Sequence, residues 1–402
     1  MGTENRGNQA LKNNIIAQID CQKDVYIQVS HDIHDRPEIG NQEFYAAKRL
    51  GELLKSSGFA VETNIAGYAT GFIARRKSKN GRGPAIGFLA EYDALPELGH
   101  ACGHNIIGTA SVAAALSLAN VLDELGGEVV VFGTPAEEGG VNGSAKASYV
   151  QQGLFKNIDA CLMIHPANRS VTTENALALD PLDFEFFGKA AHAAAAPEQG
   201  INALDGVIQL FNGINALRQQ LASDIRIHGI IIHGGDAPNI IPAYAKARFF
   251  VRAANRSRCD ETTSKVKAIA EGAALATGTQ VKIGYFQNQV DDFVINQKFN
   301  TLFQEVMAEL GENLAASSNQ SVGSTDAGNV SHVVPTIQPS LKIGPPEMPS
   351  HSVEFCKAAK SKEGDAALLV GAKALAITGL ILLTDHERLQ AIRAEFQESK
   401  SR

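Results

Sequence analysis

The chain has 402 residues and a formal net charge of -7 at pH 7, with 44% hydrophobic and 20% charged residues. This length exceeds what one ordinary core supports, so we expect two domains. The balance of residues is typical of globular rather than disordered proteins. Because the basic residues are scattered along an acidic chain, the sequence predicts neither nucleic-acid binding nor a polybasic membrane patch.

Three further features bear on the compartment. The polar N-terminal stretch lacks the apolar segment of a secretory signal. The apolar run 367–383 is interrupted by Lys373 and Thr378, which predicts a buried helix rather than a membrane span. The five cysteines are odd in number and irregularly spaced, so no disulfide framework is expected. We therefore expect a cytoplasmic protein with reduced thiols and no membrane partner.

In chain order, the first part alternates helices with buried strands. Helical periodicity over about 14–57 is broken at Pro37. Further along, the pattern predicts strands at 70–76, 84–93, 128–138 and 160–166, with an alanine-rich helix at 106–125. Strands that are apolar on both faces and alternate with helices are typical of α/β proteins. We expect a mixed, mostly parallel sheet covered by helices.

The pattern changes near residue 180. The expected elements are then a half-exposed strand at 182–193, a helix at 202–221, strands at 226–235 and 243–254, a helix at 258–277 and a strand at 280–286. The order β-α-β-β-α-β is the ferredoxin-like plan. We therefore predict one domain of residues 1–180 and 293–402, interrupted by an inserted α+β domain of residues 181–292.

Side chains able to bind a metal follow the expected strands. Cys102 and His104 are separated by one glycine, and a thiolate with an imidazole suits a borderline-soft cation. So short a motif is equally consistent with a chance cluster in a loop. Glu137 and Glu138 close the strand 128–138, where one carboxylate could bind a metal and the other carry a proton. A solvated Glu pair is the alternative.

Two histidines add to this pattern. His165 lies at the end of the strand 160–166, where a core histidine is the alternative. His351 lies in a loop bounded by prolines, where a surface histidine is the alternative. Ligands of open α/β sheets bind at the carboxyl ends of the strands. The shared position of these residues favours a metal site.

Eight blocks in a fixed order resemble the M20 family of metal-dependent peptidases and amidohydrolases. They cover nearly the whole chain: HDIHDRPEIGNQEF, EYDALPELGHACGHN, GTPAEEGG, MIHP, GKAAHAAAAPEQGINALDGV, PNIIPAYAKARFFVRA, GSTDAGNVSHVVPT and MPSHSVEF. The strongest likeness is to the subgroup with a cysteine ligand, which hydrolyses aminoacyl amides. The resemblance implies a zinc-exopeptidase-like catalytic domain with an inserted lid or dimerisation domain, and a homodimer formed through that insert.

The resemblance also implies a ligand set for two divalent metal ions, namely Cys102, His104, Glu138, His165 and His351. Mixed sulfur, nitrogen and oxygen ligands suit zinc, while carboxylates and imidazoles also admit manganese. We expect zinc, with manganese as the alternative.

Four further residues receive roles from the resemblance. Glu137 is implied as the general base that takes a proton from the metal-bound water. His192 is implied to reach the reacting carbonyl from a dimer partner, and Asn239 to contact substrate. Asp93 is implied to orient a metal ligand.

The chain departs from many cysteine-type relatives in two places. It has Glu91-Tyr92-Asp93 where they have Asp-x-Asp, and Asn105 where they have Asp. These differences favour the p-aminobenzoyl-glutamate hydrolase and dipeptidase branch over the hippurate branch. We expect hydrolysis of an amide bond in N-acyl amino acids, aminobenzoyl-glutamate-like compounds or small peptides, with a dipeptidase or endopeptidase as the alternative.

Two rivals of other classes remain at this point. A thiol hydrolase could use Cys102 as nucleophile with a histidine as base, but it would leave the paired carboxylates unused. A binding protein that keeps the fold without catalysis is the second rival, and the complete ligand set speaks against it.

Overall fold

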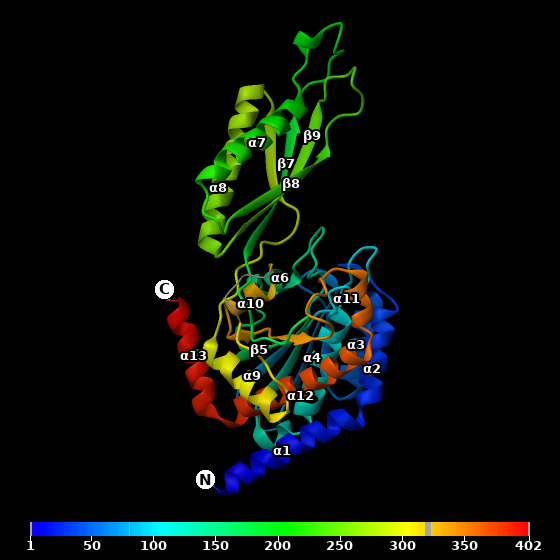
Figure 1. Cartoon of the computed structure of the whole chain (residues 1–402), viewed down its shortest axis with the longest axis vertical. Helices are drawn as coiled ribbons and strands as arrows, with labels where there is room; N and C mark the ends of the chain where they lie inside the picture. The colour runs from blue at the N-terminus through cyan, green and yellow to red at the C-terminus, as the bar shows by residue number, and fades with distance from the viewer. Residues whose placement is uncertain (1, 80, 318–322, 401–402) are drawn as a thin grey trace. The chain divides into compact units, whose positions relative to one another are not determined.

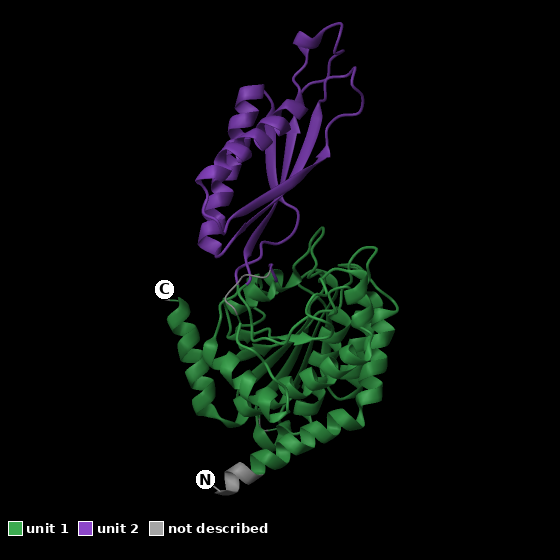
Figure 2. Ribbon diagram, viewed as in Figure 1, with its two compact units in different colours: residues 1–175, 293–320, 326–402 green, residues 176–292, 321–325 purple. Residues whose placement is uncertain are grey.

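The structure is a computed structural model that describes residues 2–79, 81–317 and 323–400. The chain forms two compact units (Figure 2). Unit 1 contains the chain up to Asn175 and most of the chain from Phe293 onward. Unit 2 contains Ala176–Asp292 and a short segment that ends at Thr325. It therefore begins earlier than the insert expected at 181–292 and includes a second piece of chain that the sequence pattern did not indicate.

Unit 1 is built around a six-stranded sheet in the order β1-β2-β4-β3-β5-β11. Strands β4, β3, β5 and β11 pair in parallel, while β1 and β2 are antiparallel at one edge. The mostly parallel sheet is confirmed. The strands are β1 (Ala60–Ile65), β2 (Tyr68–Lys77), β3 (Ala85–Ala90), β4 (Glu128–Gly133), β5 (Ala160–Leu162) and β11 (Thr336–Ile337). A separate parallel pair joins β6 (His165–Ala167) to β12 (Ser340–Lys342).

Helices cover this sheet (Figure 1). Every residue of β3 is buried, as expected of a strand with both faces covered. The helices of unit 1 are α1 (Gly2–Cys21), α2 (Lys23–His34), α3 (Phe44–Ser56), α4 (His104–Ala119), α5 (Leu122–Leu125), α6 (Ala145–Gln151), α9 (Gln297–Glu309), α10 (Ala327–Ser331), α11 (Val353–Ala358), α12 (Lys362–Thr384) and α13 (His386–Lys400).

Helices α4 and α12 form the centre of the core. All residues of α4 are buried. Gly379 of α12 lies so close to α4 that a Cβ there would be 2.7 Å from Leu118 Cδ2. By length and composition α12 could span a membrane, but 72% of its most apolar window is buried inside the protein. The apolar run near the C-terminus is thus a buried core helix.

Unit 2 has an antiparallel sheet in the order β10-β7-β9-β8. Its elements are β7 (Ala178–Phe187), α7 (Ala203–Leu217), β8 (Arg226–His233), β9 (Tyr244–Ala253), α8 (Arg256–Thr277) and β10 (Gln280–Tyr285), with short 3₁₀ turns at Pro197–Gln199 and Arg218–Gln220. The ferredoxin-like plan is confirmed. Strand β8 lies at one edge and exposes Ile230, Ile231 and Ile232 by 61%, 47% and 47%.

Three local predictions are wrong. Strand β4 ends at Gly133, so Glu137 and Glu138 lie in the loop that follows it and do not close a strand over 128–138. Strand β5 ends at Leu162 and His165 begins a second strand, β6, so His165 does not close a single strand over 160–166. Strand β7 begins at Ala178 and ends at Phe187, so the expected strand at 182–193 is displaced and His192 lies outside it.

Candidate metal centre

The carboxyl ends of two neighbouring strands bring the acidic residues of unit 1 together. Strands β3 and β4 run in parallel, and Ala90 is paired with Gly133 at their ends. Glu91 and Asp93 directly follow β3, while Glu137 and Glu138 follow β4. Parallel pairing therefore places two pairs of carboxylates at one edge of the sheet, where ligands of such folds bind.

The Cys-Gly-His motif is bent toward this edge at the start of α4. Gly103 has a left-handed φ of 77°, and His104 is the first residue of the helix. A Cβ at Gly103 would lie 2.8 Å from Pro166 Cγ, so no other residue fits there without a shift. The close approach brings Cys102 Sγ within 3.5 Å of His165 Nε2.

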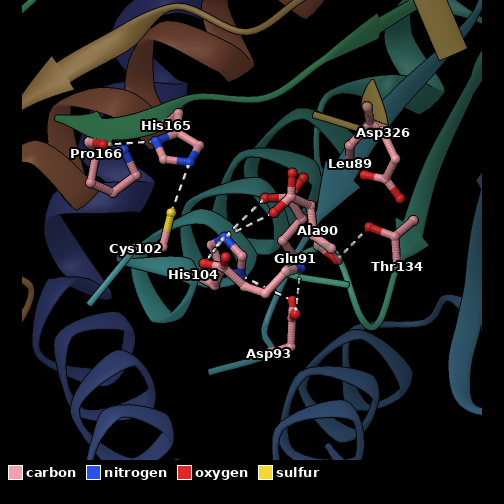
Figure 3. Close-up of polar contacts among 12 residues, drawn as sticks. Leu89, Ala90, Glu91, Asp93, Cys102, His104, Thr134, His165, Pro166 and Asp326 are labelled. Carbon is pink, nitrogen blue, oxygen red and sulfur yellow. Dashed lines mark hydrogen bonds and ion pairs between the residues drawn. The ribbon is translucent and has the colours of Figure 1, made fainter. Parts of the chain in front are cut away.

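Hydrogen bonds at Nδ1 fix both histidines so that Nε2 of each ring points at other side chains of the site (Figure 3). His104 Nδ1 lies 3.0 Å from Asp93 Oδ1, and His165 Nδ1 lies 2.7 Å from the Pro166 carbonyl. In each case Nδ1 carries the proton and donates it. Nε2 is then free to bind a cation, which is the arrangement that metal-binding histidines need. The second oxygen of Asp93 accepts the Glu138 backbone N–H at 3.0 Å.

The remaining ligand atoms converge on the same region. His104 Nε2 is 3.7 Å from Glu138 Oε1, and Glu138 Oε2 is 3.7 Å from His351 Nε2. Two groups of donor atoms that each lie within 4.8 Å of one another could hold a metal ion: Cys102 with His104 and His165, and Cys102 with Glu138 and His351. The five residues implied as ligands thus form one cluster, and the Cys102 sulfur belongs to both groups.

The electrostatics of this cluster fit positive ions. His104 Nε2 and Glu138 Oε1 are buried with no hydrogen-bond partner among the described residues. Burial, followed by the charges of Glu91 and Glu138, raises the pKa of Glu137 well above its usual range. Burial likewise raises the pKa of the Cys102 thiol. Burying ligand atoms without partners and crowding carboxylates together lowers the stability of the folded protein unless a cation binds them. This set of ligand atoms therefore suits two divalent ions.

One residue of the cluster, His351, and one beside it, Ala136, adopt a left-handed backbone conformation that side chains disfavour. Ala136, directly before Glu137, has φ 57°, and His351 has φ 56°. The His351 N–H is held by the Ala101 carbonyl at 3.1 Å. Left-handed non-glycine residues are concentrated at functional sites, and here they set the direction of Glu137, Glu138 and His351.

Sequence reasoning missed a buried ion-pair network beside the cluster. Lys146 of α6 has a side chain that is 0% exposed, and its Nζ lies 2.6 Å from Asp326 Oδ1 and 2.7 Å from Glu91 Oε1. The other oxygen of Glu91 is 3.6 Å from His104 Nε2. Glu91, His104 and Glu137 form a third group that could hold an ion. Glu91 and Asp326 lie in blocks that carried the resemblance, but nothing in the local pattern marked Lys146 as buried.

The other two sequence-predicted residues lie in unit 2, where they are close to each other. The His192 segment pairs with the Asn239 segment through a bond from Ala193 N–H to the Asn239 carbonyl at 3.0 Å. His192 Nδ1 accepts the N–H groups of Ala194 and Ala195 at 3.2 and 3.1 Å. Nδ1 is therefore unprotonated in neutral His192, and the exposed ring presents Nε2–H as a donor.

Comparison with known proteins agrees with this geometry. Residues 182–277 match the peptidase dimerisation domain of the M20 family. The chain is 34% identical to mouse (Mus musculus) Xaa-Arg dipeptidase, over 97% of this chain and 93% of the relative. It belongs to the M20 family. It is also 29% identical to a p-aminobenzoyl-glutamate hydrolase chain of Escherichia coli strain K12, over 94% of this chain and 93% of the relative.

Solved structures share the fold of this M20 chain. A Bacillus subtilis protein described as a dinuclear metal binding peptidase from the M20 family superposes with a TM-score of 0.65 at 20% identity, covering 90% of this chain and 99% of that one. The M20 chain is accordingly a hydrolase with a peptidase or amidohydrolase activity, and the binding protein without catalysis is not supported.

Proposed function

We propose that this M20 chain hydrolyses the amide bond of dipeptides or of N-acyl amino acids such as p-aminobenzoyl-glutamate, with two divalent cations. The observation that carries the proposal is the pair of donor groups that share the Cys102 sulfur beside Glu137. Cys102, His104 and His165 would hold one cation, and Glu138 and His351 would hold the other together with Cys102. When bound, the cations act as Lewis acids on the amide carbonyl and the attacking water.

Glu137 is the proton carrier in this proposal. Its Oε2 lies 3.8 Å from His104 Nε2, so its carboxylate faces the same space as the ligand atoms. Burial and neighbouring carboxylates raise the pKa of Glu137, which favours uptake of a proton. Glu137 takes a proton from the attacking water and delivers it to the leaving amine, as general acid-base catalysis requires.

Zinc is the proposed metal, with manganese as the alternative. A thiolate is a soft ligand that favours zinc over harder cations. The carboxylate and imidazole ligands of the second group are also compatible with manganese.

A thiol mechanism fits the geometry less well. Cys102 Sγ and His165 Nε2 are 3.5 Å apart, the spacing of a loose Cys-His pair. This pair alone would leave His104 and His351, which also lie near the Cys102 sulfur, without a role. Glu137 and Glu138 would also have no role in that reaction.

We further propose a homodimer through unit 2, with His192 donating from Nε2–H to the carbonyl oxygen in the partner's site. The dimerisation-domain match at 182–277 supports the dimer. The exposed isoleucines of edge strand β8 support its pairing with a second copy. Asn239, whose backbone pairs beside His192, is the proposed substrate contact.

Mixing inactive subunits tests the shared site. We combine His192→Ala protein with Glu137→Gln protein and verify subunit exchange by mass spectrometry. If His192 acts across the dimer, each mixed dimer has one intact site and one doubly defective site. With random exchange, activity should recover to about a quarter of wild type. Mixtures that stay inactive after complete exchange would show that His192 does not act in the partner's site.

The proposed substrate class is tested by hydrolysis. Purified protein is stripped of metal and reloaded with zinc or manganese, then assayed with Xaa-Arg and other dipeptides, p-aminobenzoyl-glutamate and N-acyl amino acids. We expect release of the amine from at least one class only after reloading. Activity of the metal-free protein at the reloaded level would contradict the proposal and favour the thiol mechanism.

A further inference from the structure

A third buried carboxylate, Glu43, contacts the loop that carries Glu137 and Glu138. Glu43 lies at the start of α3, is 0% exposed, and is 93 residues away from that loop in the sequence. Its Oε1 accepts the Ala136 backbone N–H at 2.9 Å and the Asn41 N–H at 2.9 Å. Its Oε2 accepts the Thr70 hydroxyl at 2.8 Å. Both oxygens are thus held by uncharged donors.

Ala136, the loop residue that donates its N–H to Glu43, has a strained left-handed backbone. Ala136 is fully buried with φ 57°, a conformation in which its Cβ is crowded by the backbone. The Ala136 carbonyl accepts the Ser144 N–H at 2.7 Å. Gly40 also lies so close that a Cβ there would be 2.9 Å from Ala136 Cβ. The left-handed turn at Ala136 is therefore stabilised by its contacts with Glu43, Ser144 and Gly40.

Two buried carboxylates hold this loop at two successive points. Glu43 accepts the N–H of Ala136, and Asp93 accepts the N–H of Glu138 at 3.0 Å. Glu137, the proposed base, lies between these two anchors. If the first anchor is lost, Ala136 can relax toward a common φ, which would rotate the next two residues away from the ligand cluster.

We propose that Glu43 is a positioning residue that locks the left-handed turn at Ala136 and thereby aims Glu137 and Glu138 at the metal centre. This role deepens the proposed function and rests on Glu138 as a ligand and Glu137 as the base. It does not require contact with substrate or metal. An oxygen acceptor at Oε1 is the essential feature, so an amide in place of the carboxylate should serve as well.

Three variants separate positioning from charge and from stability. Glu43→Gln keeps an oxygen that accepts the Ala136 N–H, whereas Glu43→Met has similar size and only a weakly accepting sulfur. Glu38→Met is the matched control, because Glu38 also accepts two backbone N–H groups at the start of α3, from Tyr45 and Ala46. Among the described residues, its side chain makes no hydrogen bond to the loop. Each variant is measured for zinc affinity by competition with a chelating dye, for kcat and KM, and for thermal unfolding.

Glu43→Met should lower zinc affinity and kcat about 10- to 100-fold, the range for residues that orient metal ligands, with little change in KM. Glu43→Gln should stay within about threefold of wild type on both measures, since the amide oxygen restores the acceptor. Glu38→Met should unfold at a lower temperature without loss of zinc affinity. Wild-type affinity and kcat in Glu43→Met would overturn the proposal, as would a Glu43→Gln loss equal to that of Glu43→Met.

The affinity measurement remains decisive if no amide substrate is hydrolysed, so failure of the proposed function and failure of this role are distinguishable. If Glu43→Met does not fold, Gly40→Ala offers a second test, because its methyl group would lie 2.9 Å from Ala136 Cβ and 3.2 Å from the Gly139 carbonyl oxygen and would displace the same turn. Gly40→Ala should also lower zinc affinity, as is expected for Glu43→Met. Unchanged affinity in folded Gly40→Ala protein would overturn the proposal.

Discussion

Replacing Glu137 by Gln should lower kcat by about 10²- to 10⁴-fold and leave the metal content unchanged. The amide has nearly the same shape as the carboxylate, but it cannot take a proton from the attacking water. Glu137 is absent from both donor groups that share Cys102, so its loss should not release either ion. Turnover measured with saturating substrate, together with elemental analysis of the same sample, checks both parts.

The neighbouring carboxylate provides the control. Glu138 contributes oxygens toward both His104 and His351, so Glu138→Gln should lose at least one metal ion as well as activity. The two adjacent substitutions have the same chemistry and should differ in metal content. Normal turnover of Glu137→Gln, or equal metal loss in both variants, would contradict the roles proposed for these two carboxylates.

Replacing Lys146 by Met should cost about 3–5 kcal/mol of stability, the usual penalty for removing one partner of a buried ion pair. Methionine fills a similar volume but leaves Asp326 and Glu91 buried without their ammonium partner, which lies 2.6 and 2.7 Å from them. The chain has no tryptophan and seven tyrosines, so urea unfolding can be followed by the near-ultraviolet circular dichroism of tyrosine.

A surface lysine is the matched control for this substitution. Lys360 pairs with Asp35 at 2.5 Å, but the two side chains are 33% and 58% exposed. Lys360→Met should cost less than about 1 kcal/mol, because exposed ion pairs are screened by water. A Lys146→Met loss no larger than that of Lys360→Met would show that the buried network does not stabilise unit 1.

Hydrophobic periodicity predicted the fold well where elements are long. The runs that became β3 and β4 are apolar on both faces. In unit 2, the alternation of apolar and polar residues matches the alternation of more and less buried side chains along β9. The strands β11 and β12 were missed because they have only two and three residues, too few for any period to show. The break between β5 and β6 was missed because Met163 and Ile164 are as apolar as the strand residues on either side.

Four of the five candidate ligands could be predicted because each follows a strand or a tight glycine turn, and such positions converge in a parallel sheet. His351 lies in a proline-bounded loop, and its role came from the resemblance. The supporting residues could not be predicted. Lys146 and Asp326 are 180 residues apart, and Glu43 and Ala136 are 93 residues apart. A lysine in a short helix and a glutamate before a helix are ordinary surface patterns, and only the three-dimensional contacts show that both are buried partners of the site.

The central proposal is that unit 1 would hold two divalent cations in the two donor groups that contain the Cys102 sulfur. X-ray absorption at the zinc edge, on protein whose metal content is known from elemental analysis, tests it most directly. We predict two zinc ions per chain, a sulfur ligand on both, and a neighbouring zinc in the spectrum. In Cys102→Ser protein the sulfur signal should disappear. One zinc per chain, or a spectrum without sulfur in the wild-type protein, would contradict the shared-thiolate centre.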